Sequence, residues 1–303
     1  MNMPTLLNFA DNRADSPDSG IFEISSTASD WLADVAVQAL IDEAELTPKP
    51  ALVDQRGSGA HVDLDLSLMR ESARSLKPGF AAMARTATLS LPDVTLRERL
   101  GAIGRDAEQA MLCATHGSNA HRGAIWILGL LVASAAINRQ SMMATGARLA
   151  CLPDRHAPMI ASHGLRVRTR YGAQGARGEA VAGFPHVFNV GLPALQAARA
   201  RGNHETHARL NALVAIMAQL EDTCLLHRGG TEALMTAQQG AGRVLLAGGV
   251  STTQGWNALL QLDDDLIARN ASPGGAADLL AATLFVDRVG RSVDHSLSPS
   301  QKE

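Results

Sequence analysis

Five segments of this sequence combine glycine with side chains that can do chemistry. They are residues 47–65, 115–123, 171–185, 221–230 and 269–280. Glycine lets a backbone approach a ligand closely, and each segment also carries Arg, His, Asp, Glu or Asn, which bind anions or move protons. We therefore expect these connections, distant along the chain, to meet around one ligand.

The first segment contains the run HVDLD, with His61, Asp63 and Asp65 at alternate positions. In an extended backbone these three side chains would project to one side, with Val62 and Leu64 on the other. Such a set suits a divalent cation or a pair of carboxylates working on a sugar. The alternative is a helix N-terminus, where Asp caps free amides and favours the helix dipole.

The second segment places Asn119, His121 and Arg122 directly before the most apolar stretch of the chain. The backbone amides and positive end of a helix that begins there would suit an anion such as a phosphate. The alternative is that Asn119 caps the helix and His121 satisfies a buried acceptor.

In the third and fourth segments, arginine lies close to a carboxylate. Arg177 and Glu179 are two residues apart among glycines, and Asp222 and Arg228 share the run EDTCLLHRGG. A salt-bridged turn would explain the first pair, and basic residues are also common at helix C-termini. The functional interpretation is an arginine fork on phosphate beside a general base or a metal-binding carboxylate.

The fifth segment, SPGGAADLL, begins with Ser272 and carries Asp278 on the helix that should follow. Capping explains Ser272, whereas a buried Asp278 would need a partner. The sequence lacks the phosphate loops of the common nucleotide folds, because it has no Gly-Lys-Ser/Thr and GAQGARG does not fit GxGxxG. A nucleotide must therefore be bound by a different kind of site.

The elements between these segments have a helical period. Apolar residues recur every three or four positions after Thr95 and after Asn203, and residues 124–137 are apolar all round, as in a central helix. Thr95 and Glu98 have the spacing of a capping box. Residues 165–171 alternate like a strand, but a single strand has no partner, so we expect helix or extended loop there.

We expect one domain, since no linker divides residues 26–290 and no repeat is evident. We predict that residues 26–290 form a helical catalytic domain. A first helix should begin near Thr27 and a last one near Ala276. Residues 1–25 and 291–303 are polar and aperiodic and are expected to be flexible ends.

Composition narrows the function further. The chain has 303 residues, 27 Lys and Arg against 30 Asp and Glu, and a net charge of −3, which argues against binding nucleic acid or membranes through bulk charge. Aromatic residues are 3% of the chain, so a β-rich fold is disfavoured. The longest uncharged apolar run has 15 residues, short of a membrane span, and the N-terminus has no signal-peptide pattern, so we expect a cytoplasmic protein.

The cysteines and arginines add two restrictions. The chain has three widely spaced Cys and no CxxC pair, which indicates neither a disulfide framework nor a structural zinc site. Only three of its basic residues are Lys. The arginine excess reflects either genomic bias or guanidinium forks that hold phosphates and carboxylates.

Taken in order, the five segments resemble the family of triphosphoribosyl-dephospho-coenzyme A synthases, which serve citrate lyase and malonate decarboxylase. The shared patterns are TPKP-x-LVD, GAH-x-D-x-D, N-x-H-[KR]-G, YG-x-x-GARGEA-x-GFP, DT followed by RGG, and RN-x-SPGG-x-ADLL. They run from Thr47 to Leu280. The chain departs from the family's usual residues at Ala120, Arg122 and Cys224, where Thr, Lys and Asn are commoner.

The resemblance implies an all-α fold, a single compact multi-helix domain with glycine-rich active-site loops between helices. It also implies that ATP is a substrate, whose 5-triphosphoribosyl group moves to the 2′-hydroxyl of 3′-dephospho-coenzyme A as adenine leaves. The bond that breaks is N-glycosidic, so the transition state should resemble an oxocarbenium ion. An acid must protonate adenine, a base must accept the hydroxyl proton, and carboxylates should stabilise the cation.

On this hypothesis, each candidate residue has a role. Asp63 and Asp65 bind Mg²⁺ or another divalent cation or face the ribosyl cation, and Glu179 or Asp222 is the base. The residues expected to hold the triphosphate and the acceptor's pyrophosphate, or to support that binding, are Arg56, Arg122, Arg177, Arg228, His61, His121, Asn119, Ser272 and Asp278.

Two other functions are weighed against this one. A metal-dependent N-glycohydrolase would use the same carboxylates to send water to the ribosyl carbon. A non-catalytic helical interaction protein gives no reason for glycine, arginine and carboxylates to cluster at several helix junctions. The transferase would pass its product to a second transferase, which attaches it to an acyl-carrier subunit. We expect that subunit to belong to malonate decarboxylase rather than to citrate lyase. Contact with that transferase or carrier, and a homo-oligomer, are further expectations.

Overall fold

The computed structural model describes the backbone of residues 17–158 and 163–296, and the side chains of residues 27–158 and 166–292. Its helices are α1 (Pro17–Glu45), α2 (Leu66–Ser75), α3 (Lys77–Ala87), α4 (Val94–Ala114), α5 (Arg122–Ile137), η1 (Arg139–Ser141), α6 (Met142–Cys151), α7 (His163–Tyr171), α8 (Gly175–Val181), η2 (His186–Gly191), α9 (Leu192–Ala200), α10 (Glu205–Gln219), α11 (Thr223–Leu246), α12 (Thr253–Ile267) and α13 (Gly274–Ser296). The described backbone contains no strand, only an isolated bridge between Asp54 and Gly57. The predicted all-α class is confirmed.

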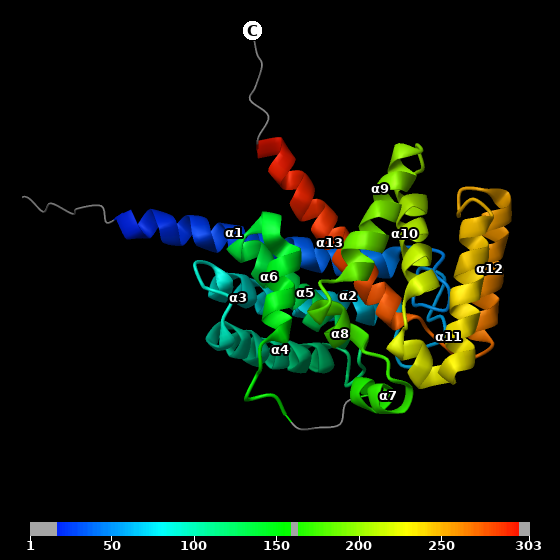
Figure 1. The fold of residues 1–303 in the computed structure, drawn as a ribbon, viewed down its shortest axis with the longest axis horizontal. Helices are drawn as coiled ribbons and strands as arrows, with labels where there is room; N and C mark the ends of the chain where they lie inside the picture. Colours follow the sequence, from blue (N-terminus) through cyan, green and yellow to red (C-terminus); the bar gives the residue numbers. More distant parts are fainter. Residues whose placement is uncertain (1–16, 159–162, 297–303) are drawn as a thin grey trace, which may run out of the picture.

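Helix α5 lies at the centre of the molecule, in contact with α1, α3, α4, α6, α8 and α13 (Figure 1). Eleven of its 16 residues are buried, as expected for a helix that is apolar on all sides. Gly129 permits close packing on α3, because a Cβ there would lie 2.7 Å from the Met83 sulfur. The central position predicted for residues 124–137 is therefore confirmed.

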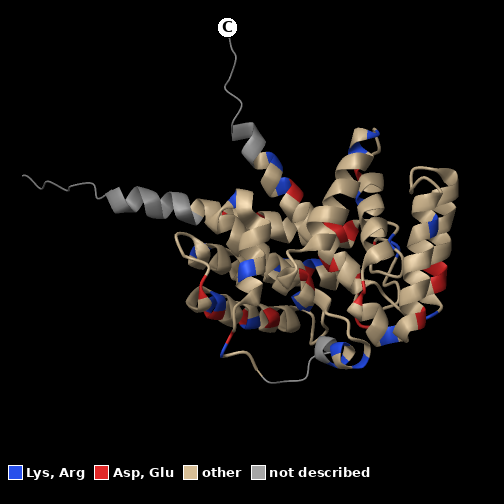
Figure 2. Ribbon diagram, viewed as in Figure 1, with Lys and Arg blue, Asp and Glu red and all other residues tan. Residues whose placement is uncertain are grey.

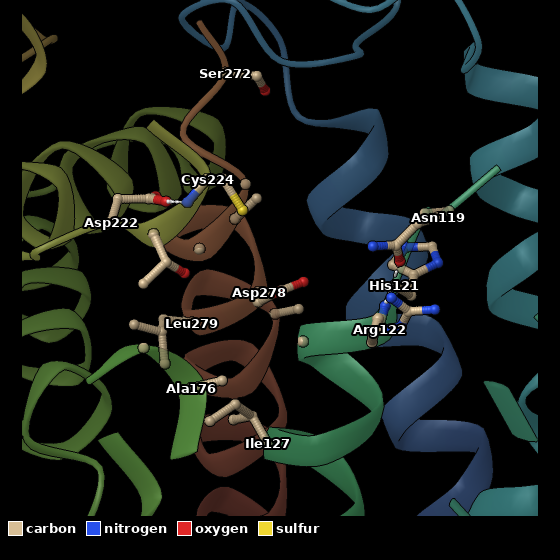
Figure 3. Close-up of a pocket in the computed structure, with 18 of the residues that line it drawn as sticks. Asn119, His121, Arg122, Ile127, Ala176, Asp222, Cys224, Ser272, Asp278 and Leu279 are labelled. Carbon is tan, nitrogen blue, oxygen red and sulfur yellow. Dashed lines mark hydrogen bonds between the residues drawn. The ribbon is translucent and has the colours of Figure 1, made fainter. Parts of the chain in front are cut away.

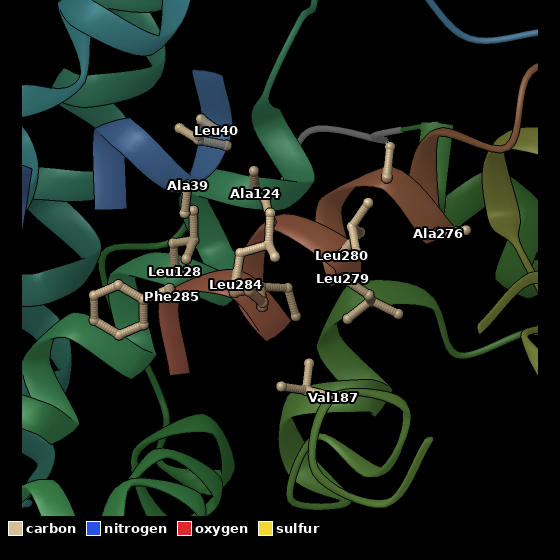
Figure 4. Close-up of a cluster of buried hydrophobic side chains, with 14 of the residues drawn as sticks. Ala39, Leu40, Ala124, Leu128, Val187, Ala276, Leu279, Leu280, Leu284 and Phe285 are labelled. Carbon is tan, nitrogen blue, oxygen red and sulfur yellow. The ribbon is translucent and has the colours of Figure 1, made fainter. Parts of the chain in front are cut away.

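The core beside the glycine-rich connections is formed by α1, α5, η2 and α13. Figure 4 shows Leu40, Leu128, Leu284 and Phe285 packed together in this region, with Val187 nearby. Burial of such side chains stabilises a fold by roughly 1.5–3 kcal/mol each relative to exposure. This packing fixes the starts of α5 and α13, which two of the five segments include.

Several helices begin at other residues than predicted. Among the described residues, helix α1 already includes Pro17, ahead of the predicted start near Thr27. Helix α13 begins at Gly274, two residues before the predicted start near Ala276, and continues to Ser296. Helix α10 begins at Glu205, two residues after Asn203. The division into one domain with two flexible ends stays a prediction.

The capping-box prediction for α4 was wrong. Its N-cap is Asp93, whose side chain accepts a hydrogen bond of 2.8 Å from the Leu96 amide. Thr95 lies inside the first turn, and Glu98 accepts hydrogen bonds from Arg155 instead of reaching back to the cap. The spacing alone could not distinguish these partners, since Arg155 is distant in the chain.

Residues 165–171 lie in helix α7, so the helical alternative is the one observed.

Within the part of the chain that the structure describes, no helix combines the length and apolar character needed to cross a bilayer.

Candidate active site

The five glycine-rich segments meet around one cavity of about 750 Å³. Figure 3 shows part of its lining, contributed by α5, α8, α11 and α13 and by the connection before α13. Of the residues predicted from the sequence, those that line it are His61, Asp63, Asn119, His121, Arg122, Arg177, Glu179, Asp222, Arg228, Ser272 and Asp278. The expected convergence of distant segments is therefore observed.

Three helices begin at the wall of this cavity. Residues of the first turns of α5, α11 and α13 line it, including Gly123, Thr223 and Gly274. The unpaired amides and the macrodipole make each such end favourable for an anion. Their convergence favours a ligand with several negative charges.

Asp222 holds two of these helix ends together. Its Oδ1 accepts hydrogen bonds from the amides of Cys224 and Leu225 in α11, and its Oδ2 accepts one of 2.9 Å from the amide of Ala276 in α13. Gly275 allows this approach, because a Cβ there would lie 2.9 Å from Oδ1. Asp222 was predicted as a possible base, but its two oxygens accept three backbone hydrogen bonds, which leaves it less capacity for a proton than a carboxylate with one bond on each oxygen.

The carboxyl group of Asp278 lies against the start of α5. It accepts a hydrogen bond from the amide of Ala124, and a Cβ on Gly123 would lie 2.1 Å from its Oδ2. Burial, followed by the nearby carboxylates of Glu43 and Asp222, raises the pKa of Asp278 well above its ordinary value. A carboxyl group held protonated at a cavity wall can donate a proton to a ligand.

A buried ion pair, which sequence reasoning missed, lines the same region. Lys49 Nζ lies 2.5 Å from Glu43 Oε1 and donates a second hydrogen bond to the Glu43 carbonyl, and both side chains are almost fully buried. The available signal was a lysine between two prolines in a chain that otherwise uses arginine.

His61 is tied to both sides of the cavity and is neutral. The Arg228 guanidinium donates to its Nδ1 at 3.0 Å, so the ring proton is on Nε2, which donates to Ser272 Oγ at 3.0 Å. Burial and then Arg228 lower the pKa of His61 to about 4. Asp63 Oδ1 lies 3.9 Å from Nδ1. The predicted one-sided arrangement was only partly right, because Leu64 also lines the cavity while Val62 is fully exposed.

Two predicted residues, Asp65 and Arg56, do not line the cavity. Asp65 caps α2 and accepts a hydrogen bond of 2.9 Å from the Leu68 amide, which is the structural alternative recognised in the sequence. Arg56 donates to Asp54 and Asp263 and so fastens its own connection to α12. Both side chains are engaged in contacts within the fold.

The arginines of the cavity differ in their partners. Arg122 forms an ion pair with Glu108, and its amide donates to Asn119 Oδ1 at 3.1 Å. Arg177 and Arg168 are exposed and form no ion pair with any described residue. Arg168, which was missed, lies on α7, where arginines occupy alternate positions (Figure 2). These free guanidinium groups can bind phosphate.

Glu179 pairs with a histidine, so the alternative of an Arg177–Glu179 salt-bridged turn was wrong. The amide and Nδ1 of His186 each lie 2.8 Å from one Glu179 oxygen. The hydrogen bond to Glu179 raises the pKa of His186, with a smaller contribution from the Gln219 carbonyl. His186 was missed because it lies in the π-helix after the motif and does not itself line the cavity.

Comparisons with known proteins agree with this geometry. Residues 29–296 match the family described as ATP:dephospho-CoA triphosphoribosyl transferase. Proteins named probable 2-(5''-triphosphoribosyl)-3'-dephosphocoenzyme-A synthase from Pseudomonas fluorescens Pf0-1 and Azotobacter vinelandii are 56% and 58% identical to this chain. The match to the Pseudomonas fluorescens protein covers 88% of this chain and 93% of the relative. The match to the Azotobacter vinelandii protein covers 85% of this chain and 90% of the relative.

A Klebsiella pneumoniae protein named 2-(5''-triphosphoribosyl)-3'-dephosphocoenzyme-A synthase is 53% identical, over 86% of this chain and 94% of its own length. No solved structure matches the chain. Since the family match spans nearly the whole helical part and includes all five segments at the cavity, the chain belongs to the ATP:dephospho-CoA triphosphoribosyl transferase family.

Proposed function

We propose that this enzyme transfers the 5-triphosphoribosyl group of ATP to the 2′-hydroxyl of 3′-dephospho-coenzyme A and releases adenine. The observation that carries the proposal is the joint presence, in one cavity, of three helix N-termini, unpaired arginines and a carboxyl group of raised pKa. These features suit a polyanionic nucleotide whose phosphates are held while its base leaves. The names of the relatives support the same reaction.

The helix N-termini and the arginines of the cavity bind the phosphates. Arg168 and Arg177 have no carboxylate partner among the described residues, so their charge is available to substrate oxygens. Arg228 keeps part of its guanidinium on the Ala60 carbonyl and His61, which aims it at the cavity. Arginine forks of this kind bind phosphate oxygens in pairs.

Bond exchange at the anomeric carbon needs one proton donated and one accepted. As the N-glycosidic bond breaks, its electron pair goes to adenine, and Asp278 supplies the proton that the base takes up. The acceptor's 2′-oxygen forms the new bond and gives its proton to Glu179, held in place by His186. Asp222 then acts as a positioning residue for α11 and α13.

This cavity can hold a magnesium ion only if the substrate supplies some of the ligands. Among the described residues, no group of three or more His, Cys, Asp or Glu could hold a metal ion. Magnesium commonly uses one or two carboxylates together with substrate phosphates. Asp63, which lines the cavity with its side chain half exposed, is the proposed protein ligand. The ion would offset the charge of the triphosphate.

The test is to incubate the protein with ATP and Mg²⁺, with and without 3′-dephospho-coenzyme A, and to quantify adenine and the coupled product by chromatography. Transfer predicts adenine only with the acceptor present, in equal amount with the product. Adenine formed equally without the acceptor would establish an N-glycohydrolase instead. No adenine and no thermal shift with ATP would indicate an interaction protein.

The product is a precursor for a carrier-bound prosthetic group, and we propose malonate decarboxylase as its user. The relatives' names do not mention either pathway. The choice therefore rests on the expectation drawn from the sequence. Supplying the purified product with the second transferase and each of the two carrier subunits would decide it. Modification of the citrate lyase carrier alone would contradict the choice.

A further inference from the structure

A buried serine and histidine form a pair at the cavity that the proposed reaction has not used. Ser72, on α2, is fully buried and does not line the cavity, whereas His121, at the N-cap of α5, does. Ser72 Oγ lies 2.6 Å from His121 Nδ1. The opposite ring nitrogen, Nε2, is buried and has no hydrogen-bond partner. Figure 3 shows the ring beside Arg122 and Asn119.

The hydroxyl group determines which nitrogen of His121 carries the proton. Ser72 Oγ has no other hydrogen-bond partner among the described residues, so its own proton is satisfied only by donation to Nδ1. The ring proton of neutral His121 is then on Nε2. A buried N–H donor of a residue that lines the cavity is thus left with no acceptor in the protein, which is costly unless a ligand supplies one.

The donor is uncharged, which limits what it can bind. Burial and, secondarily, the cation of Lys49 lower the pKa of His121 to about 3, so the ring is neutral at physiological pH. Leu40, Leu52 and Met69 line the same cavity. A neutral donor with apolar neighbours suits the edge of an aromatic heterocycle, while the exposed arginines suit phosphate.

We propose that His121 Nε2–H donates a hydrogen bond to a ring nitrogen of the ATP adenine, and that Ser72 is a positioning residue that fixes this tautomer. The inference rests on the proposed function. As the N-glycosidic bond breaks, its electron pair moves into the purine and the ring nitrogens become better acceptors. The hydrogen bond therefore strengthens as adenine leaves, and it serves catalysis as well as recognition of the base.

The test compares ATP with 1-deaza-, 3-deaza- and 7-deaza-ATP, each of which replaces one ring nitrogen by C–H. Dissociation constants are measured without the acceptor, and kcat/KM with it. One analogue should bind about tenfold more weakly than ATP to the unaltered enzyme. His121→Leu should bind ATP about tenfold more weakly and lose the discrimination against that analogue. His121→Gln, which can place an amide N–H near the same point, should retain part of it.

Ser72→Ala separates positioning from packing. It should reduce the same discrimination severalfold, since the ring can then adopt the other tautomer. The control is Ser75→Ala on the same helix, whose hydroxyl donates to the Ser72 carbonyl rather than to His121; it should leave discrimination unchanged. If the unaltered enzyme converts ATP normally but distinguishes none of the three analogues, this inference is overturned and the proposed function stands. If it releases no adenine from ATP, the proposed function itself fails.

Discussion

Three carboxylates near the cavity have different environments and therefore different chemistry. Glu43 is paired with Lys49, burial raises the pKa of Asp222 although several backbone amides oppose this shift, and burial with two neighbouring carboxylates raises the pKa of Asp278 well above its ordinary value against the Ala124 amide alone. Of the three, the least compensated carboxyl group, Asp278, has the strongest tendency to hold its proton. This is why we assign proton donation to Asp278, although the sequence indicated it only as a substrate-binding residue.

The first prediction concerns Asp278→Asn. An amide cannot supply the proton, so kcat should fall about 10²–10⁴-fold. A carboxyl whose folded pKa is raised stabilises the fold below its unfolded value of about 3.9, and this stability is lost as pH rises through the folded pKa. The Asn variant avoids that loss, so its thermal midpoint should rise relative to the unaltered enzyme as pH increases.

Asp264→Asn is the control for this variant, because Asp264 is exposed on α12 and does not line the cavity. It should leave both kcat and the pH dependence of stability unchanged. Near-normal adenine release by Asp278→Asn would remove Asp278 from the mechanism.

The second prediction concerns Arg168→Gln on α7. Removing an unpaired cation from the cavity should raise the KM for ATP severalfold and weaken its dependence on salt, with little change in the thermal midpoint. Arg166→Gln, on the same helix but outside the cavity, is the matched control. Equal effects of the two variants on KM would argue for general surface charge instead of a phosphate contact.

At the level of the elements, the site is a junction of helix starts. Asp222 caps α11 and α13 at once, and Asp278 on α13 accepts from α5, so three helix N-termini are tied by two carboxyl groups. Helix α11 also turns at Gly230, whose φ of 64° and ψ of −159° are available to glycine alone. This break lies two residues after Arg228 and ends the first helical turns of α11 at the cavity.

The third prediction tests the contact between α5 and α13 with Gly123→Ala. Alanine normally favours a helix over glycine by about 1 kcal/mol. Here the new Cβ would lie 2.1 Å from Asp278 Oδ2, so the carboxyl must move away from the start of α5. The variant should gain no stability, as followed by urea unfolding, and should lose at least tenfold in kcat.

Gly290→Ala, in α13, is the matched change, because nothing lies within 4 Å of the position of its Cβ. It should be neutral or stabilising, with normal activity. If Gly123→Ala behaves in the same way, the contact with Asp278 is not required.

At the level of the whole molecule, arginine forks join helices away from the cavity. Asp42 of α1 pairs with Arg209 of α10 and Arg288 of α13, and Arg199 of α9 pairs with Glu205 and Asp287. The hydrogen bond from Arg199 lowers the pKa of Glu205 to about 2. The stability that Glu205 contributes is therefore complete above about pH 4.5 and is lost as pH falls toward 2. Arginine in this chain therefore has a structural role as well as the proposed role in phosphate binding.

The fourth prediction is that Asp42→Asn destabilises the fold by about 1–3 kcal/mol, since it leaves the partly buried Arg288 without a charged partner and removes one of the two carboxylates that Arg209 contacts. Activity per folded molecule should not change. Asp34→Asn, on the same helix, removes an exposed ion pair to Lys77 and should cost less than about 0.5 kcal/mol. Denaturant unfolding distinguishes the two, and equal losses would contradict a stabilising role for this network.

Local pattern determined the helical class, the central place of residues 124–137 and the membership of eleven predicted residues in one site. Helical period and glycine-rich connections are properties of neighbouring residues, so they can be read along the chain. The order of the motifs also indicated the family, which the comparisons confirmed.

Only the tertiary structure decided the partners of each side chain. It placed Asp65 and Arg56 outside the cavity, paired Lys49 with Glu43, and brought Ser72 behind His121. Each outcome depends on how helices that are distant in sequence pack against one another. A rotation of one helix about its axis would move a side chain from the cavity to a capping position. Burial and neighbouring charges, which set the protonation of Asp278 and His121, exist only once that packing is complete.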